Sequence, residues 1–185
     1  MTVSQSKVEL RKYLRARLNA MSAEEKSIQS ANIAESVKKL DLPRGSICIY
    51  KSLDSEVDTA KIIEYFQGKR DVYLPVVDGD DILLVKADKN TEYRVAKWGI
   101  LEPIGERLLP ENVKPKITVT PLLGVDKDLG RLGKGKGFYD RYFAKVDTLK
   151  IGLAFDGQIV DSVPCEQNDI KLDMLISASK IFLRQ

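Results

Sequence analysis

The sequence predicts an α/β fold, namely a single three-layer domain built on a mostly parallel sheet. Short apolar segments rich in β-branched residues alternate along the chain with segments of helical period, which is typical of helices covering both faces of a sheet. The length of 185 residues suffices for one domain with a sizeable core but not for two ordinary ones. No repeat, low-complexity tract or linker divides the chain, so we expect residues 1–185 to form one domain.

Composition narrows the classes of function. Apolar residues make up 43% and charged residues 31% of the chain, and no apolar run reaches the roughly 20 residues of a membrane span. The amino terminus lacks the apolar core of a signal peptide. We therefore expect a cytoplasmic protein, monomeric, without a membrane partner. The formal charge of +3 is too small to require nucleic acid.

The absence of histidine restricts the chemistry further. It removes the usual general base, the commonest metal ligand and every Ser-His or Cys-His nucleophile. The two cysteines, Cys48 and Cys165, lack the close spacing of zinc or redox motifs and are expected to be free thiols. Carboxylates, cations and a metal ion are left, and these are the usual means of phosphoryl transfer.

The first predicted element is an amphipathic helix over residues 5–20. Its apolar stripe faces the core and the neighbouring stripe is basic; the two stripes comprise Leu10, Leu14 and Leu18, and Lys7, Arg11 and Arg15. Periodicity alone makes the basic stripe a solvated helix face. A capping box at Ser22 then begins a second helix that runs to about Leu40.

A strand-loop-helix unit follows. Residues 47–50 form a short apolar strand, and Asp58 and Thr59 begin a helix that ends at Gly68. Residues 51–57 lie between them. Open α/β sheets bind ligands at this position, beyond the carboxyl end of a strand.

The second half of the chain is predicted to contain mostly strands. A hairpin turn at residues 78–80 joins two strands, and residues 88–115 are polar and irregular, which is typical of a functional or mobile segment. The remaining expected elements are strands at 71–77, 82–85, 116–122 and 151–155, a helix at 138–145, and one or two strands within 172–183.

The most distinctive stretch is the glycine loop, residues 130–137. It holds four of the twelve glycines, interleaved with three cations, and an aromatic pair and a carboxylate follow it directly. Glycines allow the backbone to turn its N–H groups inward as an anion-binding nest, so the pattern predicts phosphate binding between a strand and a helix. The alternative is a flexible, solvated basic turn.

The loop matches neither of two widespread phosphate motifs. Gly137 stands where a P-loop needs Ser or Thr, which leaves no hydroxyl for magnesium. Phe138 stands where the dinucleotide fingerprint needs glycine or alanine.

The chain resembles the 5-formyltetrahydrofolate cyclo-ligase family, also called methenyltetrahydrofolate synthetases, over nearly its whole length. The matching residues are the basic first helix with Lys7 and Arg11, Tyr50-x-Ser52-x-x-x-Glu56-Val57, Trp98-Gly99-Ile100-x-Glu102-Pro103, Thr120-Pro121-Leu122-Leu123-Gly124-Val125-Asp126, Gly130-Arg131-Leu132-Gly133-x-Gly135-x-Gly137-Phe138-Tyr139-Asp140-Arg141 and Asn168-Asp169-x-x-x-Asp173. The resemblance implies a topology similar to that of sugar-phosphate isomerases and CoA transferases. It also implies ATP- and Mg²⁺-dependent cyclisation of 5-formyltetrahydrofolate to 5,10-methenyltetrahydrofolate, with release of ADP and phosphate.

The resemblance also implies a set of site residues. ATP is expected to contact the first helix and the glycine loop, at Lys7, Arg11, Arg131, Leu132, Gly133, Lys134, Gly135, Lys136, Gly137, Phe138 and Tyr139. The folate is expected to contact Lys51, Glu56, Trp98, Lys134, Gly135, Lys136, Gly137, Phe138 and Tyr139. Mg²⁺ is assigned to Asp140 and Asp169, and the catalytic cations are Arg131 and Lys136.

Several of these residues have an alternative role that does not involve a ligand. Glu56 can accept paired N–H bonds from a pterin ring, but without the resemblance it is an ordinary loop acid. Asp140 is otherwise a first-turn acid favoured by the helix dipole, and Trp98 otherwise anchors its own loop. Asp173 is a metal ligand or makes a structural bond. Arg15 matches by periodicity alone and is not assigned to the site.

Two other functions compete with the cyclo-ligase. The basic glycine loop and first helix could form a non-catalytic module that binds anions or nucleic acid, and the salt dependence of its binding would reveal it. A folate-binding relative without catalytic activity is the other candidate, and the intact glycine loop argues against it.

Overall fold

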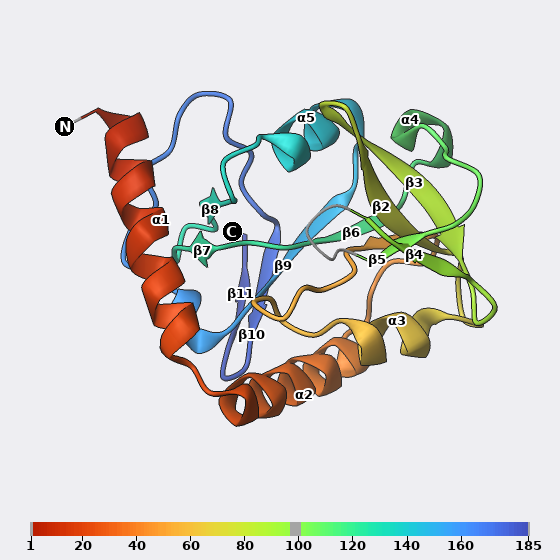
Figure 1. The fold of residues 1–185 in the computed structure, drawn as a ribbon, viewed down its shortest axis with the longest axis horizontal. Helices are drawn as coiled ribbons and strands as arrows, with labels where there is room; N and C mark the ends of the chain where they lie inside the picture. The colour runs from red at the N-terminus through yellow and green to blue at the C-terminus, as the bar shows by residue number, and fades with distance from the viewer. Residues whose placement is uncertain (1, 97–100, 185) are drawn as a thin grey trace.

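A seven-stranded sheet forms the centre of the protein, in the order β11-β10-β9-β6-β1-β2-β3 (Figure 1). The computed structural model describes residues 2–96 and 101–184. From β10 to β2 neighbouring strands are parallel, and the edge strands β11 and β3 pair antiparallel with their neighbours, which confirms a mostly parallel sheet. The strands are β1 (Ile47–Ile49), β2 (Val72–Asp78), β3 (Asp81–Ala87), β6 (Ile117–Thr120), β9 (Leu149–Ala154), β10 (Met174–Ser177) and β11 (Ile181–Leu183).

Strand β1 shows how the sheet acquires two buried faces. Successive side chains of a strand point to opposite faces. Ile47 and Ile49 belong to the apolar cluster that includes α2 (Ala23–Lys39) and α3 (Ala60–Phe66), whereas Cys48 packs in the cluster on α5 (Phe138–Lys145). Helices therefore cover both faces, as the three-layer prediction requires, with α2 and α3 on one side and α5 on the other (Figure 1).

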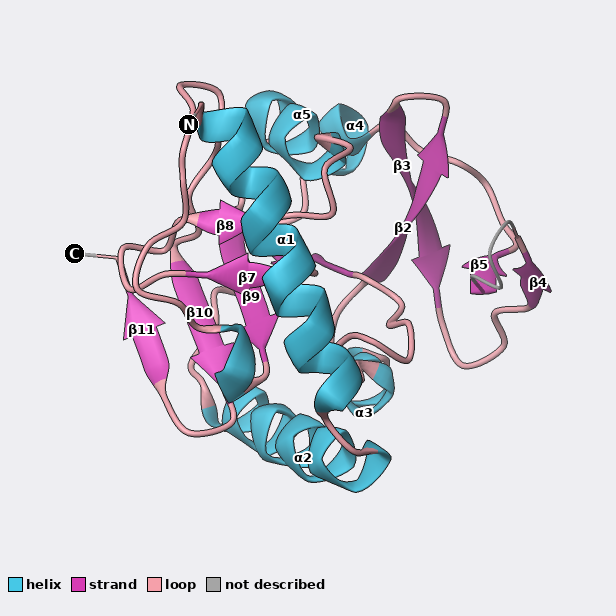
Figure 2. Ribbon diagram, turned by 60° about the vertical axis from the view of Figure 1, so that its left-hand side comes forward, coloured by secondary structure: helices cyan, strands magenta, loops and turns pink. Residues whose placement is uncertain are grey.

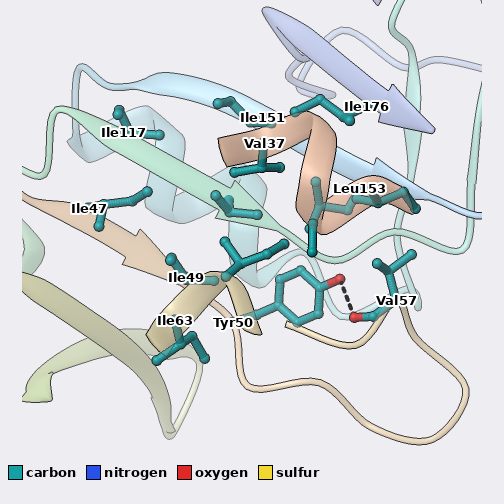
Figure 3. Packing of buried hydrophobic residues seen from close by; sticks show 14 of the residues in the cluster. Val37, Ile47, Ile49, Tyr50, Val57, Ile63, Ile117, Ile151, Leu153 and Ile176 are labelled. Atoms are coloured by element: carbon teal, nitrogen blue, oxygen red, sulfur yellow. Dashed lines mark hydrogen bonds between the residues drawn. The ribbon is translucent and has the colours of Figure 1, made fainter. Parts of the chain in front are cut away.

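The larger cluster lies between the sheet and the helix pair. Val37 of α2 and Ile63 of α3 meet isoleucines of the central strands there, including Ile117 and Ile151 (Figure 3). Strand β6 is buried at every position, as expected for a central strand covered on both faces. Apolar side chains that are fully buried here each stabilise the fold by about 1.5 to 3 kcal/mol.

Helix α1 (Val3–Ala20) lies across the carboxyl ends of the central strands (Figure 2). Its predicted apolar stripe is confirmed, because Leu14 and Leu18 are buried and Leu10 packs against the same core. The helix approaches the chain after β6 so closely that a Cβ at Gly124 would collide with Leu14 Cδ1, so a side chain there would force Leu14 to shift. Helix η2 (Asp156–Gln158), which follows β9, also contacts α1.

The predicted starts of α2 and α3 are confirmed, whereas α1 begins at Val3, two residues before the predicted start. Ser22 forms the expected capping box, with its hydroxyl accepting the Glu25 N–H at 3.1 Å and the Glu25 carboxylate accepting the Ser22 N–H at 2.7 Å. Asp58 accepts the Ala60 N–H at 2.9 Å where α3 begins. No helix within residues 2–96 and 101–184 is long and apolar enough to cross a membrane.

The prediction of irregular structure over residues 88–115 is wrong in part. Strands β4 (Tyr93–Val95) and β5 (Leu101–Pro103) pair antiparallel there, and α4 (Pro110–Val113) follows them. Each element has only three or four residues, which is too short for periodicity to reveal. The strand expected over 116–122 ends at Thr120, directly before Pro121, which has no N–H to donate to a ladder.

Candidate functional site

The glycine loop connects a small two-stranded ribbon to a helix. Strands β7 (Gly124–Val125) and β8 (Arg131–Leu132) pair antiparallel, and the loop then runs to Gly137, the residue that precedes α5. The ribbon was not predicted, because two-residue strands leave no pattern. The predicted order of strand, glycine loop and helix is nevertheless confirmed.

Asp126 holds the start of the loop. Its carboxylate is buried, and one oxygen accepts the N–H groups of Asp128 at 3.0 Å and Gly130 at 2.8 Å. The other oxygen accepts the Val163 N–H at 2.8 Å. Because hydrogen bonds to a charged group are about twice as strong as neutral ones, Asp126 fixes the glycine loop against the segment that leads to Asp169.

The loop backbone has the conformation that anion binding requires. Gly135 and Gly137 have φ angles of 102° and 68°, which residues with side chains rarely adopt. Gly137 is also the N-cap of the eight-residue helix α5, and no side-chain cap hydrogen bond is made there. The N–H groups of the first turn are therefore available to an anion at the loop.

Arg11 lies directly against the glycine loop. Its Nε donates to the carbonyl oxygen of Gly133 at 3.0 Å, and a Cβ at Gly135 would lie 3.3 Å from its Cζ. The basic stripe of α1 is therefore not merely solvated at this position. Arg15 is exposed, in keeping with its exclusion from the site.

Lys7, one turn earlier on α1, is almost buried and touches two carboxylates. Its Nζ lies 2.5 Å from Asp169 Oδ2 and 2.9 Å from Glu166 Oε2, with 10% of the side chain exposed. Burial alone lowers the pKa of Lys7, but hydrogen bonds to Asp169 and Glu166 and the attraction of their charges outweigh it, so the pKa is raised. The ammonium is fixed and fully charged at neutral pH.

Arg131 is buried beneath the loop and pairs with Asp140. Its Nη2 lies 2.8 Å from Asp140 Oδ1, and 4% of its side chain is exposed, against 29% for Asp140. The same carboxylate oxygen accepts the Ile170 N–H at 3.4 Å, which places Asp140 beside the segment that carries Asp169. Among the described atoms, Arg131 Nε is buried without an acceptor.

The two carboxylates predicted to hold Mg²⁺ are thus near each other in the fold. Within residues 2–96 and 101–184 no group of three or more acidic or cysteine side chains is arranged to hold a metal. Mg²⁺ is usually bound by one or two carboxylates, several waters and substrate phosphates. Asp140 and Asp169 therefore fit a magnesium ion that arrives with a nucleotide, and they do not form a metal cage by themselves.

Glu56 and Lys134 meet across the site. Lys134 Nζ lies 2.7 Å from Glu56 Oε1, and Glu56 Oε2 accepts the Leu53 N–H at 2.9 Å. The loop that carries Glu56 is fixed in turn, since the buried hydroxyl of Tyr50 donates to the carbonyl oxygen of Val57 at 3.0 Å (Figure 3). Burial raises the pKa of Tyr50 well above its usual value, which keeps this donor protonated.

Two of the remaining predicted residues, Lys51 and Tyr139, make cation–π contacts. Lys51 Nζ lies 5.3 Å from the ring centroid of Tyr93 in β4, a cation–π contact, and Arg131 Cζ lies 5.7 Å from that of Tyr139. Lys136 is exposed and has no carboxylate partner in the part of the chain that the structure describes. Trp98 lies outside the described residues.

The sequence left the role of Asp173 open between a metal ligand and a structural bond. In the structure its carboxylate makes structural bonds. Its Oδ2 accepts the backbone N–H of Lys150 at 2.9 Å and the Lys150 ammonium at 3.2 Å, and its Oδ1 lies 3.5 Å from Arg184 Nη1. These bonds join β9, β10 and the end of β11, so Asp173 fastens the edge of the sheet.

Sequence reasoning missed Glu166 and Tyr93. Glu166 contacts Lys7, and its N–H donates to Asp169 Oδ2 at 2.6 Å, so it orders both partners. The one available signal was its spacing of three residues from Asp169, which permits a turn, but surface acids with this spacing are common. Tyr93 gave no signal, because the strand that carries it was not predicted.

Comparison with known proteins shows which family the chain resembles in sequence and fold. The family model described as the 5-formyltetrahydrofolate cyclo-ligase family matches residues 3–178. The chain is 33% identical to 5-formyltetrahydrofolate cyclo-ligase of Haemophilus influenzae (93% of this chain, 96% of the relative) and 31% identical to that of Mus musculus (95% of each). The solved structure of 5,10-methenyltetrahydrofolate synthetase from Aquifex aeolicus superposes with a TM-score of 0.82 at 30% identity, over 97% of this chain and 93% of the other. The chain therefore belongs to the 5-formyltetrahydrofolate cyclo-ligase family.

Proposed function

We propose that this protein closes 5-formyltetrahydrofolate to 5,10-methenyltetrahydrofolate at the expense of ATP, releasing ADP and phosphate. The observation that carries the proposal is the position of α1, which brings Lys7 and Arg11 to the glycine loop and to Asp169 from the other end of the chain. Cations, loop N–H groups and two carboxylates then surround one place at the carboxyl edge of the sheet, which is the composition of a phosphoryl-transfer site.

The reaction needs activation of a poor leaving group. Transfer of the γ-phosphoryl group to the formyl oxygen leaves the formyl carbon electrophilic, and N10 of the same molecule attacks it. The carbon–oxygen bond then breaks and phosphate leaves with the former formyl oxygen, while N10 loses its proton. Because effective molarities of intramolecular reactions reach roughly 10⁵ to 10⁸ M, the protein need not activate the nucleophile. A site without histidine is adequate for this chemistry.

The basic residues bind and neutralise the phosphates in this proposal. Lys7, Arg11, Lys134 and the N–H groups of residues 132–139 hold the triphosphate, and Lys136 contacts the group in transfer, where the charge increases. Arg131 acts from beneath the loop. Its guanidinium holds Asp140 at 2.8 Å and adds positive charge directly under the phosphates.

Asp140 and Asp169 would hold the magnesium ion that accompanies ATP. Such an ion neutralises phosphate oxygens and favours their transfer. Residues of the chain prepare its place, because Arg131 orients Asp140, and Lys7 and the Glu166 N–H orient Asp169.

Glu56 and its surroundings bind the folate. The carboxylate would accept N–H groups of the pterin ring, with Lys51 and Tyr139 beside it. The contact of Trp98 with the folate stays a prediction. The fixed loop that carries Glu56 favours this role, because an acceptor in a fixed position discriminates well between ring systems. The monomeric state, the cytoplasmic location and the extent of the domain over residues 1–185 stay predictions.

The proposal is tested by incubating the purified protein with 5-formyltetrahydrofolate, ATP and Mg²⁺ and recording the methenyl chromophore. The mechanism is tested by labelling the formyl oxygen with ¹⁸O. We expect the label in the released phosphate, because that oxygen leaves with phosphorus. Methenyl product without label in the phosphate would keep the activity and reject the phosphorylated intermediate.

A further inference from the structure

The ion pair between Lys134 and Glu56 joins two subsites that the proposed function assigns to different substrates. Lys134 belongs to the glycine loop, and Glu56 to the loop after β1. We propose that this pair couples the two subsites, so that bound nucleotide strengthens folate binding and bound folate strengthens nucleotide binding. The inference rests on the proposed function, since it needs phosphate at Lys134 and the folate ring at Glu56.

The Glu56 carboxylate is fixed in place. Its Oε2 accepts the Leu53 N–H at 2.9 Å, and its own N–H donates to the Leu53 carbonyl oxygen at 2.9 Å. Only 8% of the Glu56 side chain is exposed. Because one oxygen is held by its own turn, the other oxygen, Oε1, is the one that meets Lys134. A ring donor that approaches Oε1 therefore competes with the Lys134 ammonium.

Lys134, in contrast, is the exposed partner of the pair. Its side chain is 45% exposed, and the flexible stem of a lysine lets the ammonium turn toward another anion. A phosphate bound in the glycine loop attracts the same ammonium. When Nζ turns to the phosphate, it leaves Oε1 of Glu56, and when a folate ring takes Oε1, it releases Nζ to the phosphate.

Each of the two exchanges favours binding of the other substrate. Each substrate removes the ion-pair partner that the other substrate would otherwise have to displace. The Lys134–Glu56 pair therefore has to be broken only once when both substrates bind. A coupling free energy is reciprocal, so both affinities change by the same factor. Pairs with one exposed partner contribute at most about 1 kcal/mol, which corresponds to a factor of roughly 2 to 5 in affinity.

Calorimetry can measure this factor without turnover. The dissociation constant of 5-formyltetrahydrofolate is determined with and without a saturating non-hydrolysable ATP analogue and Mg²⁺. For the wild type we expect the analogue to lower it roughly 2- to 5-fold. In Lys134→Met without nucleotide, the dissociation constant of 5-formyltetrahydrofolate should be equal to or lower than that of the wild type without nucleotide. Adding the ATP analogue should no longer change it.

Lys136→Met is the matched control. It removes the same charge two positions along the same loop, from a residue that has no carboxylate partner among those described. It should weaken nucleotide binding and keep the coupling at saturating analogue. In Glu56→Gln, folate should bind more weakly and the coupling should disappear, with no further change on adding Lys134→Met. Circular dichroism checks that each variant is folded.

Two results would overturn the inference: a wild-type folate affinity that saturating nucleotide leaves unchanged, or full coupling in Lys134→Met. Both presuppose that the wild type binds 5-formyltetrahydrofolate and forms methenyl product. Absence of binding and product would instead reject the proposed function on which the inference rests.

Discussion

At the scale of single residues, each of the three acidic side chains assigned to ligand binding at the candidate site has a basic side chain of the same site as its partner. Asp140 pairs with Arg131, Asp169 with Lys7, and Glu56 with Lys134. Removing one member of an ion pair leaves the charge of the other member unbalanced. The loss of stability is largest where that remaining charge is buried. Loss of activity and loss of stability therefore have to be measured together at these positions.

Asp140→Asn tests this at the proposed metal ligand. Arg131 would remain buried without its counter-charge, so we expect the free energy of unfolding to fall by about 1 to 3 kcal/mol, together with nearly all turnover. The double variant Arg131→Gln, Asp140→Asn removes the orphaned charge and should regain part of this stability while staying inactive. Urea unfolding and magnesium-dependent turnover are measured for the wild type, Asp140→Asn and the double variant. Near-normal turnover of Asp140→Asn at low magnesium would remove Asp140 from the metal site.

The Lys7 cluster predicts a pH dependence. The pKa of Lys7 is raised above its ordinary value of 10.5, so the unfolded chain loses this proton at a lower pH than the folded protein. The stability that Lys7 contributes is therefore complete below pH 10.5 and is lost as the pH rises through the raised pKa. We expect the difference in unfolding free energy between wild type and Lys7→Met to be constant from neutral pH up to about pH 10 and to shrink above it. A difference that stays constant at alkaline pH would show that the cluster does not depend on the ammonium charge.

The residue types of the site could be predicted, but their pairing could not. The glycine loop and the resemblance named the residues of all three ion pairs. Nothing in the sequence says that Lys7 reaches Glu166, because the contact depends on how α1 crosses the sheet and on the bonds that Asp126 makes to Val163. Long-range contacts of polar side chains leave no periodic signal.

At the scale of elements, α1 does two things at once. Its apolar stripe covers the carboxyl ends of the central strands, and its basic stripe reaches the glycine loop and the segment that carries Asp169. The period of the helix places the two stripes side by side. The sequence therefore predicted the helix and its core face correctly, whereas the role of the basic stripe came from the resemblance alone.

Substitutions along the basic stripe separate these roles. Lys7→Ala and Arg11→Ala should raise the KM for ATP, whereas Arg15→Ala should not, because Arg15 is exposed and lies outside the assigned site. Loss of one charge-assisted hydrogen bond of about 1.5 to 3 kcal/mol corresponds to roughly a 10- to 150-fold weakening. Steady-state kinetics over a range of ATP concentrations measures it. Equal effects from all three substitutions would mean that the stripe acts only as a diffuse positive field.

The elements that the sequence placed most accurately are the longer ones, which have enough residues to show a period or a cap. Helices α1, α2 and α5 and strands β2 and β3 agree with expectation to within about two residues, and Ser22 marks the start of α2 correctly. The strands that were missed, β4, β5, β7 and β8, have two or three residues each. Their pairing is decided by the surrounding fold and not by local preference.

At the scale of the whole molecule, the sheet order places the site. The strand ladder from β10 to β2 is parallel, so the carboxyl ends of its strands meet at one edge, and α1 and the loops that carry Glu56 and Lys134 gather there. Alternating strands and helices were sufficient to predict a parallel sheet with two covered faces. The strand order itself and the crossing of α1 follow from packing that no local pattern encodes.

The cyclo-ligase reaction is tested most directly by following methenyl absorbance and phosphate release together on the purified protein. We expect one phosphate released per methenyl group formed, with both rates dependent on magnesium and both abolished when 5-formyltetrahydrofolate is omitted. ATP hydrolysis without methenyl product, or methenyl formation without ATP, would contradict it.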